Sequence, residues 1–407
     1  MKTPECLTET LVTYRQSPYL DVTTTASGGS VFNILSGKRY ELGQRALDIL
    51  TFFRVPRSLD AFQAQFVTAE EANVVEWFRR HQMLVEATPD GWEAFTTSLI
   101  AVKDRLFGLP AYHDKASVVL VGIPFGKGNG RSMGGAEFPF RIREFSQKHG
   151  LRLAGSALSF LDRTTADRLR PLFLDHRLVD AGNLFVSQNE STPFLYEKMY
   201  RMARQLFGRR QRPLFIGGDH SISYPLIRAA AERFPGLHIL HFDAHTDTYG
   251  SRFDAVDHAG KIHHYGNFMT HCLALDGVAK VYQIGIRGLT NAFAQSVDKQ
   301  HIIWSHEAIA QLQNGLPFDL PQDVPWYVTF DVDVIDPAVL PGTATPVVGG
   351  FTVREIDQLL AQWLPGRQVV GGDVVEANPD YDATDRTTQL TAEIILKLLS
   401  HFTPNPS

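Results

Sequence analysis

Four stretches of the chain place acidic and histidine side chains directly after short apolar runs. They are residues 216–221 (IGGDHS), 242–247 (FDAHTD), 330–333 (FDVD) and 372–376 (GDVVE). Carboxylate oxygens and imidazole nitrogens are common ligands of divalent cations, and a set without any thiolate suits manganese or magnesium better than structural zinc. The residue types therefore indicate a divalent metal centre.

The spacing within these stretches supports metal binding. Asp243, His245 and Asp247 alternate along an extended segment, so one face presents three candidate ligands, and Asp331 and Asp333 repeat the arrangement. Burying so many carboxylates together without cations would be strongly repulsive. A single aspartate of this kind could equally be a turn or capping residue. Together with His220 of the first stretch, however, these residues form a set that suits two ions sharing bridging carboxylates.

The elements that would position these residues alternate between strands and helices after about Asp114. This alternation predicts an α/β fold with a doubly wound parallel sheet. In such a sheet the carboxyl ends of the strands share one edge, where ligands bind, so residues distant in sequence converge on one crevice. The predicted strands are residues 117–123, 213–216, 238–242, 280–284, 326–330 and 368–370.

These motifs resemble those of the ureohydrolase family, which includes arginase, agmatinase, guanidinobutyrase and formiminoglutamase. The resemblance covers roughly residues 115–400 and extends to 134–139 (GGAEFP), 344–350 (ATPVVGG) and 373–379 (DVVEANP), in the family's order. It implies an arginase-like three-layer αβα fold. It also implies an enzyme that uses two Mn²⁺ ions to hydrolyse a guanidinium group to urea and a primary amine.

The same resemblance implies how the two ions would be held, with Asp243 and Asp331 bridging them. One ion would be bound by His220, Asp243, Asp247 and Asp331, and the other by Asp243, His245, Asp331 and Asp333. The ions would lower the pKa of a bridging water, so that hydroxide exists at working pH.

Catalytic and substrate-binding roles are also implied by the resemblance. Glu376 would pair with the guanidinium, and Asp247 would also steer the proton of the hydroxide. His264 would shuttle a proton to the leaving amine. The family's usual His-Gly pair reads His264-Tyr265 here, so the neighbouring His263 is the alternative shuttle. His263 and Tyr249 are further candidates for substrate contacts.

Three functions remain open on this reading. The segment Asp247-Thr248-Tyr249-Gly250 is not followed by the serine-rich loop with which arginase reads a free α-carboxylate, so free L-arginine is disfavoured. The first function is a peptide arginase, which converts arginine side chains of a precursor peptide to ornithine. The second is an agmatinase-type enzyme that converts agmatine to putrescine and urea. The third, a non-catalytic binding protein that kept the fold, is disfavoured by the intact ligand set.

The N-terminal region has a different pattern. Residues 31–35 and 39–42 predict a hairpin, and 83–87 and 92–95 predict a second one. Three helices lie between them, with Ser58 and Thr68 as N-caps. This order is that of a winged helix and resembles the PqqD-like domains that bind the leader of a precursor peptide at a sheet edge. A purely structural or oligomerising extension is the alternative. Seven Lys/Arg against nine Asp/Glu between Val31 and Phe95 disfavour DNA binding.

The predicted organisation is a winged-helix-like domain at 1–95, a linker at 96–114, a catalytic domain at 115–400 and a tail at 401–407. A net charge of −5 gives no sign of a nucleic-acid or membrane partner. Two cysteines in 407 residues, no signal-peptide pattern and no apolar run of 18 residues indicate a cytoplasmic protein. The family commonly forms trimers or hexamers, so a homo-oligomer is possible.

Overall fold

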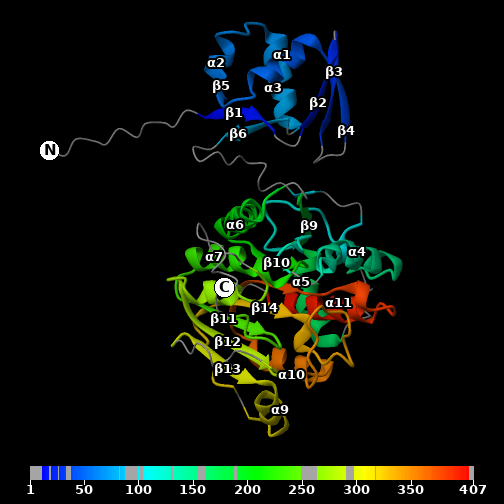
Figure 1. Ribbon diagram of the computed structural model, residues 1–407, viewed down its shortest axis with the longest axis vertical. Helices are drawn as coiled ribbons and strands as arrows, with labels where there is room; N and C mark the ends of the chain where they lie inside the picture. Colours follow the sequence, from blue (N-terminus) through cyan, green and yellow to red (C-terminus); the bar gives the residue numbers. More distant parts are fainter. Residues whose placement is uncertain are drawn as a thin grey trace, which may run out of the picture. The chain divides into compact units, whose positions relative to one another are not determined.

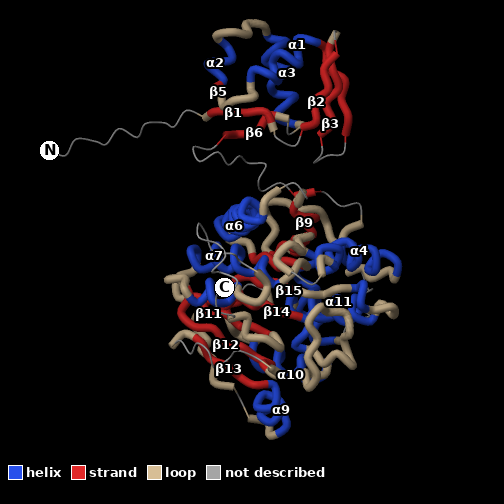
Figure 2. The backbone as a smooth tube through the Cα atoms, in the orientation of Figure 1, coloured by secondary structure: helices blue, strands red, loops and turns tan. Residues whose placement is uncertain are grey.

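The computed structural model describes most of the chain as two compact units, Met1–Ile100 and Ala101–Ser407 (Figures 1 and 2). Its described part contains no helix that is long and apolar enough to cross a membrane. The described residues are 12–17, 20–25, 27–33, 38–81, 83–87, 99–100, 104–129, 132–153, 162–187, 190–248, 264–289, 298–316 and 318–402.

The described residues of the smaller unit form two three-stranded antiparallel sheets and three helices, which confirms the predicted small N-terminal domain. One sheet has the strand order β2-β3-β4 and the other the order β5-β1-β6. The elements are β1 (Thr13–Gln16), β2 (Leu20–Thr25), β3 (Gly28–Asn33), β4 (Lys38–Gly43), α1 (Gln44–Phe52), β5 (Arg57–Ser58), α2 (Leu59–Gln63), α3 (Ala69–Arg80), β6 (Leu84–Ala87) and β7 (Leu99–Ile100).

Local signals in this unit predicted the first hairpin and the three helices, but not β1, β2 or β5. The hairpin is formed by β3 and β4, and both N-caps are present: Ser58 accepts a hydrogen bond from the Ala61 amide, and Thr68 forms a capping box with Glu71. The predicted second hairpin, 83–87 with 92–95, stays a prediction. Among the described residues β6 pairs with β1, whereas residues 92–95 lie outside them. The strand β1 was not predicted because its four residues, TYRQ, carry no apolar alternation.

Where it is described, the larger unit contains a sheet of eight parallel strands, which confirms the doubly wound sheet. Their order is β13-β12-β11-β14-β15-β10-β8-β9. The outer strands β13 and β9 were not predicted, because polar residues interrupt their apolar runs. The bounds are β8 (Val118–Gly122), β9 (Leu178–Leu184), β10 (Arg212–Ile216), β11 (Leu237–Phe242), β12 (Val278–Ile286), β13 (Gln300–Trp304), β14 (Pro325–Asp331) and β15 (Gln368–Val375).

Helices cover both faces of this sheet (Figure 1). On one face α6 (Thr192–Gly208), α7 (Ser223–Arg233) and α8 (Phe268–Leu273) pack in sequence, with α7 against β14 and β15. The other face carries a continuous apolar core shared with the remaining helices. They are α4 (Phe138–Lys148), α5 (Arg163–Leu174), α9 (Ser305–Gln313), α10 (Val353–Trp363) and α11 (Arg386–Leu399).

The four central strands end at the same level. Ile216 of β10, Phe330 of β14 and Phe242 of β11 form one row with Val374 of β15 through successive strand pairs. The residues that follow this row are the acidic and histidine-bearing loops. The register of the sheet therefore brings the four sequence motifs to one edge.

Candidate metal centre

Two glycines, Gly217 and Gly218, form the turn between β10 and the segment that contains His220. Gly217 and Gly218 adopt φ angles of 80° and 93°, a left-handed region that disfavours other residues. A Cβ atom on Gly217 would also lie 2.6 Å from the ring of Pro139. Substitution at this position would therefore displace either α4 or His220, which is fully buried.

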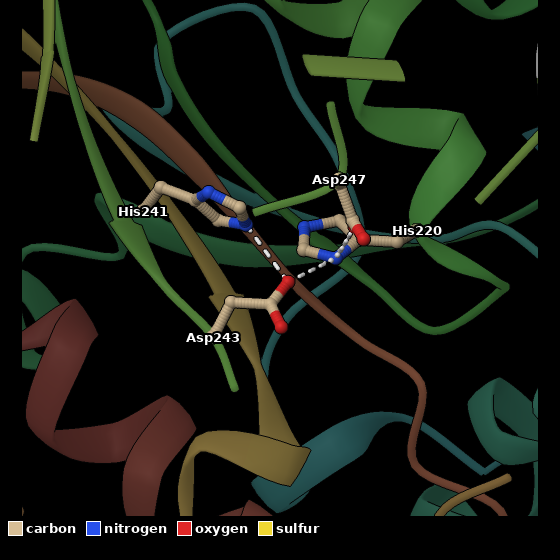
Figure 3. Close-up of side chains that lie close together, drawn as sticks. All are labelled: His220, His241, Asp243 and Asp247. Carbon is tan, nitrogen blue, oxygen red and sulfur yellow. Dashed lines mark hydrogen bonds and ion pairs between the residues drawn. The ribbon is translucent and has the colours of Figure 1, made fainter. Parts of the chain in front are cut away.

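His220 faces three carboxylates at short range. Its Nδ1 atom lies 3.1 Å from Asp243 Oδ2 and 3.2 Å from an Oδ2 atom of both Asp247 and Asp331. Within the described part of the chain this buried nitrogen has no hydrogen-bond partner of suitable geometry. Figure 3 shows His220, Asp243 and Asp247 converging on one point. An imidazole nitrogen surrounded by carboxylate oxygens fits a divalent cation.

A second group of ligand atoms adjoins the first. His245 Nδ1 lies 3.4 Å from Asp243 Oδ1 and 3.0 Å from Asp333 Oδ2. Asp243 thus directs one oxygen to each group, as a bridging carboxylate would. The side chain of His245 is 19% exposed whereas that of His220 is fully buried, so the first group is deep and the second is nearer solvent. All six predicted ligands lie in this cluster, and its donor set fits two divalent cations.

The electrostatics of the cluster also favour cations. Burial, followed by the charge of Asp243, raises the pKa of Asp247 to about 7. Burial and the neighbouring charges of Asp333 and Asp243 raise the pKa of Asp331 well above its ordinary value. Burial lowers the pKa of His220, but its three carboxylate neighbours outweigh that effect and raise it. Without metal, protons would have to neutralise the cluster, and divalent cations can replace them.

Two of the predicted catalytic residues have left-handed backbones. Asp247 has a φ angle of 48° and Glu376 one of 62°. Such conformations cost a non-glycine residue about 1–3 kcal/mol and persist only where the surroundings impose them. Here the Glu376 amide donates to Gly218 O at 3.0 Å, and Asp247 O accepts from the Met269 amide at 3.1 Å. These contacts aim both carboxylates at the cluster.

Glu376 lies beside the deep group of ligands. Its Oε1 atom accepts a hydrogen bond of 2.9 Å from the His220 amide, and Oε2 accepts one of 3.2 Å from Asn129 Nδ2. Burial and the charge of Asp219 raise its pKa to about 8. A carboxylate has about four acceptor positions, so Glu376 retains capacity for a cationic group of a substrate. Asn129 was not predicted, because its loop has no metal-ligand spacing.

Of the remaining predicted residues the structure describes His264, which precedes a turn at residues 265–267. His264 Nδ1 accepts a hydrogen bond of 3.2 Å from the Gly266 amide, and the Tyr265 amide donates to Gly128 O at 3.2 Å. This contact joins the turn of His264 to the loop that bears Asn129. Tyr249 and His263 lie outside the described residues.

Sequence reasoning missed a group of buried polar residues behind the ligands. His241 Nε2 lies 2.8 Å from Asp243 Oδ2, and His220 Nε2 lies 2.9 Å from Thr329 Oγ1 (His241 is drawn in Figure 3). Asp373 accepts from Thr329, and Gln283 contacts His241. One signal could have found them: each is a polar residue in the apolar half of its strand that leads into a loop at the carboxyl edge.

A parallel sheet with a histidine and aspartate cluster for two cations at its carboxyl edge is the arrangement of a metal-dependent hydrolase. Residues 116–400 match the "Arginase family". The chain belongs to the arginase family and is a hydrolase.

Several known proteins share this part of the chain. An agmatinase of Edwardsiella ictaluri is 33% identical over 297 residues, which are 71% of this chain and 88% of that protein. The structure of a proclavaminate amidino hydrolase from Streptomyces clavuligerus is similar with a TM-score of 0.61 and 29% identity, covering 74% of this chain and 97% of that one. An arginase from Medicago truncatula gives a TM-score of 0.56 at 26% identity, covering 71% and 88%.

Proposed function

We propose that this protein is a manganese-dependent ureohydrolase whose substrate is an arginine side chain of a precursor peptide. The reaction would consume one water and yield urea and an ornithine side chain. Family membership and the cluster around Asp243 support hydrolysis of a guanidinium group. The N-terminal unit, which lies outside the family match, supports the peptide substrate.

Manganese fits the donor set of the cluster. Carboxylate oxygens and imidazoles suit Mn²⁺, and no cysteine belongs to either group of ligand atoms. Asp243 and Asp331 are proposed to bridge the ions. His220 and Asp247 would complete the deep site, and His245 and Asp333 the outer one. When bound, the two ions supply a hydroxide at neutral pH.

The protein's own side chains would then bind the substrate and move its protons. Glu376 would pair with the guanidinium, which remains protonated at neutral pH. Asp247 would accept the proton that the attacking oxygen loses. His264, or His263 beside it, would protonate the leaving amine, because C–N cleavage expels an amine rather than an amide anion.

The single observation that favours a peptide is the open edges of the N-terminal sheets. In the sheet β2-β3-β4 the strands β2 and β4 each pair on one side only among the described residues. Such an edge can accept an extended peptide as an additional strand. A peptide-bound arginine also has no free α-carboxylate. A small free guanidine would need neither feature.

An agmatinase-type activity is the second candidate. It is favoured by the 33% identity with the Edwardsiella ictaluri enzyme, whose name states that activity. In that case Tyr249 and His263 would contact a substrate without a carboxylate, and the N-terminal unit would serve another purpose.

Urea release distinguishes these candidates. The full chain, loaded with Mn²⁺, is assayed with agmatine, L-arginine, an arginine-containing peptide and the same peptide behind its leader. We expect turnover of the peptide, and faster turnover when the leader is present. A chain that lacks residues 1–100 should lose the leader effect. Preferential turnover of agmatine would instead support the second candidate, and an absence of urea with every guanidine would refute the proposed reaction.

A further inference from the structure

A row of four polar side chains crosses the buried sheet two residues before the metal-binding aspartates. Gln283 of β12, His241 of β11, Thr329 of β14 and Asp373 of β15 are successive partners in the register of the strands. Partners in register point to the same face of the sheet. All four side chains therefore point to the face that α7 and α8 cover. Each is fully buried. Such a row is costly in a sheet interior unless every polar group is paired.

The first half of the row determines which nitrogen of His241 carries hydrogen. Gln283 Nε2 lies 2.6 Å from Thr246 O, and a backbone carbonyl can only accept, so the amide orientation follows. The same NH₂ group lies 2.9 Å from His241 Nδ1, which must therefore accept. The hydrogen of the neutral imidazole is then on Nε2, from which it donates to Asp243 Oδ2 at 2.8 Å. His241 thus orients the bridging carboxylate and is not itself a ligand.

The second half of the row determines the form of His220. Asp373 accepts hydrogen bonds of 2.7 Å from the Tyr327 hydroxyl and 2.6 Å from Thr329 Oγ1. In the second of these bonds Thr329 is the donor, so its single hydroxyl hydrogen is directed to Asp373. Thr329 Oγ1 must then accept from His220 Nε2, at 2.9 Å. In the neutral imidazole this arrangement leaves Nδ1 without hydrogen, facing the three aspartates, which is the form that binds a metal.

We propose that Gln283, Thr329 and Asp373 are positioning residues that impose the metal-binding tautomer on His220 and the hydrogen-donating one on His241. The row thereby sets how tightly the deep cation is held. This inference rests on the metal site of the proposed function. It assigns a role to three strand residues that contact no substrate and would bind no metal.

The test compares Mn²⁺ affinity and histidine tautomers in the full chain. In Thr329→Val, a substitution of similar shape, the acceptor for His220 Nε2 is lost, and we expect the dissociation constant of the tighter Mn²⁺ ion to rise about 10–100-fold. Thr329→Ser retains the hydroxyl and should restore affinity to within about threefold. Tyr327→Phe is the matched control. It removes another hydroxyl from the same carboxylate of Asp373 but leaves the chain to His220 intact.

Titration calorimetry with a competing chelator measures the affinity, and ¹⁵N spectra of histidine-labelled protein report the tautomers. We expect His241 with hydrogen on Nε2 in the wild type, and a mixture of forms in Gln283→Leu. Equal Mn²⁺ affinity in the valine and serine variants of Thr329 would overturn the inference alone, because the wild type would still bind two ions. A wild type that takes up no Mn²⁺ would instead refute the proposed function and the inference with it.

Discussion

Glu376 is buried between two hydrogen-bond donors and beside a cluster of ligands, yet it is not one of the predicted metal ligands. Its left-handed backbone and the amide of His220 determine where its carboxylate lies. The geometry separates two tasks. The aspartates that follow β11 and those at the end of β14 lie with the histidine nitrogens of the cluster, whereas Glu376, directly after β15, lies beside them, where we propose that it pairs with the guanidinium of the substrate.

The substitution Glu376→Gln tests this separation. It retains the size of the side chain but removes its charge. We expect kcat/KM to fall on the order of 100-fold, because a hydrogen bond to a charged group contributes about 1.5–3 kcal/mol. Steady-state urea assays measure the loss, and elemental analysis should find unchanged metal content. Glu355→Gln, in the exposed capping box of α10, is the control and should leave kcat/KM unaltered. Loss of metal in the Glu376 variant would contradict its assignment to the substrate.

At the scale of elements, a buried ion pair holds α4 against β9. Arg143 donates from Nε to Asp180 Oδ2 at 3.0 Å and from Nη2 to Oδ1 at 2.8 Å, and both side chains are almost inaccessible. Asp180 also accepts from the Leu106 amide at 2.7 Å. This pair joins α4, whose first residues belong to the stretch 134–139, to β9 in the outer part of the sheet.

Removing one partner of this pair should be costly. In Arg143→Met the carboxylate of Asp180 remains buried without its cation, so we expect the free energy of unfolding to fall by about 3–5 kcal/mol. Urea denaturation followed by circular dichroism measures the change. Arg141→Ala provides the comparison on the same helix, because Arg141 is half exposed and lies 4.0 Å from Glu144. It should change stability by less than about 0.5 kcal/mol. Similar losses of unfolding free energy in both variants would show that burial does not increase the contribution of the Arg143–Asp180 pair to stability.

The first turn of α11 depends on a carboxylate that precedes it. Asp382 accepts hydrogen bonds of 2.6 Å from the Thr387 amide and 2.9 Å from the Thr384 amide. Burial raises the pKa of Asp382, but a hydrogen bond from the Thr384 hydroxyl together with those from the two amides outweighs that effect and lowers the pKa to about 2. Because the folded-state pKa lies below the unfolded value, this stabilisation is present above about pH 4 and is lost as the pH falls toward 2.

We therefore expect Asp382→Ala to reduce the free energy of unfolding by about 1–2 kcal/mol at pH 7. The difference from the wild type should shrink as the pH falls below 4, and urea denaturation at pH 7, 4 and 3 measures it. Asp385→Asn is the control, because Asp385 precedes α11 but makes no capping hydrogen bond with its side chain. A difference that grows toward low pH would contradict the assignment.

At the scale of the whole molecule, each of the two units has a hydrophobic core of its own. One core groups residues between Val31 and Leu84, and the other groups residues between Leu106 and Phe402. All six candidate ligands belong to the larger unit. Cation binding therefore acts directly on the stability of that unit alone.

Thermal unfolding should reflect this division. Free Mn²⁺ at 100 times its dissociation constant should stabilise the larger unit by about 2.7 kcal/mol, because it binds the folded form only. Differential scanning calorimetry of the full chain with and without Mn²⁺ should show one transition that moves and one that does not. A chelator should reverse the shift. A single transition that moved as a whole would mean that the two units unfold cooperatively, and it would contradict this division of stability.

The sequence by itself determined the class of fold and the members of the candidate cluster. Apolar runs, glycine turns and N-caps such as Ser58 and Thr68 are local signals, and each reports the conformation of a few adjacent residues. The parallel sheet adds one general rule, that strand ends share an edge. That rule was sufficient to predict that Asp243 and Asp331 would meet, although they are far apart in the chain.

Only the tertiary structure decided which polar groups stand behind the ligands. Gln283, Thr329 and Asp373 lie in one row because β12, β11, β14 and β15 are neighbours in the sheet and pair in that register. The sequence of a single strand determines neither its neighbours nor its register. The pairing of β1 with β6 and the left-handed backbone of Glu376 have the same origin. They depend on contacts between residues distant in sequence, and local propensity carries no information about those contacts.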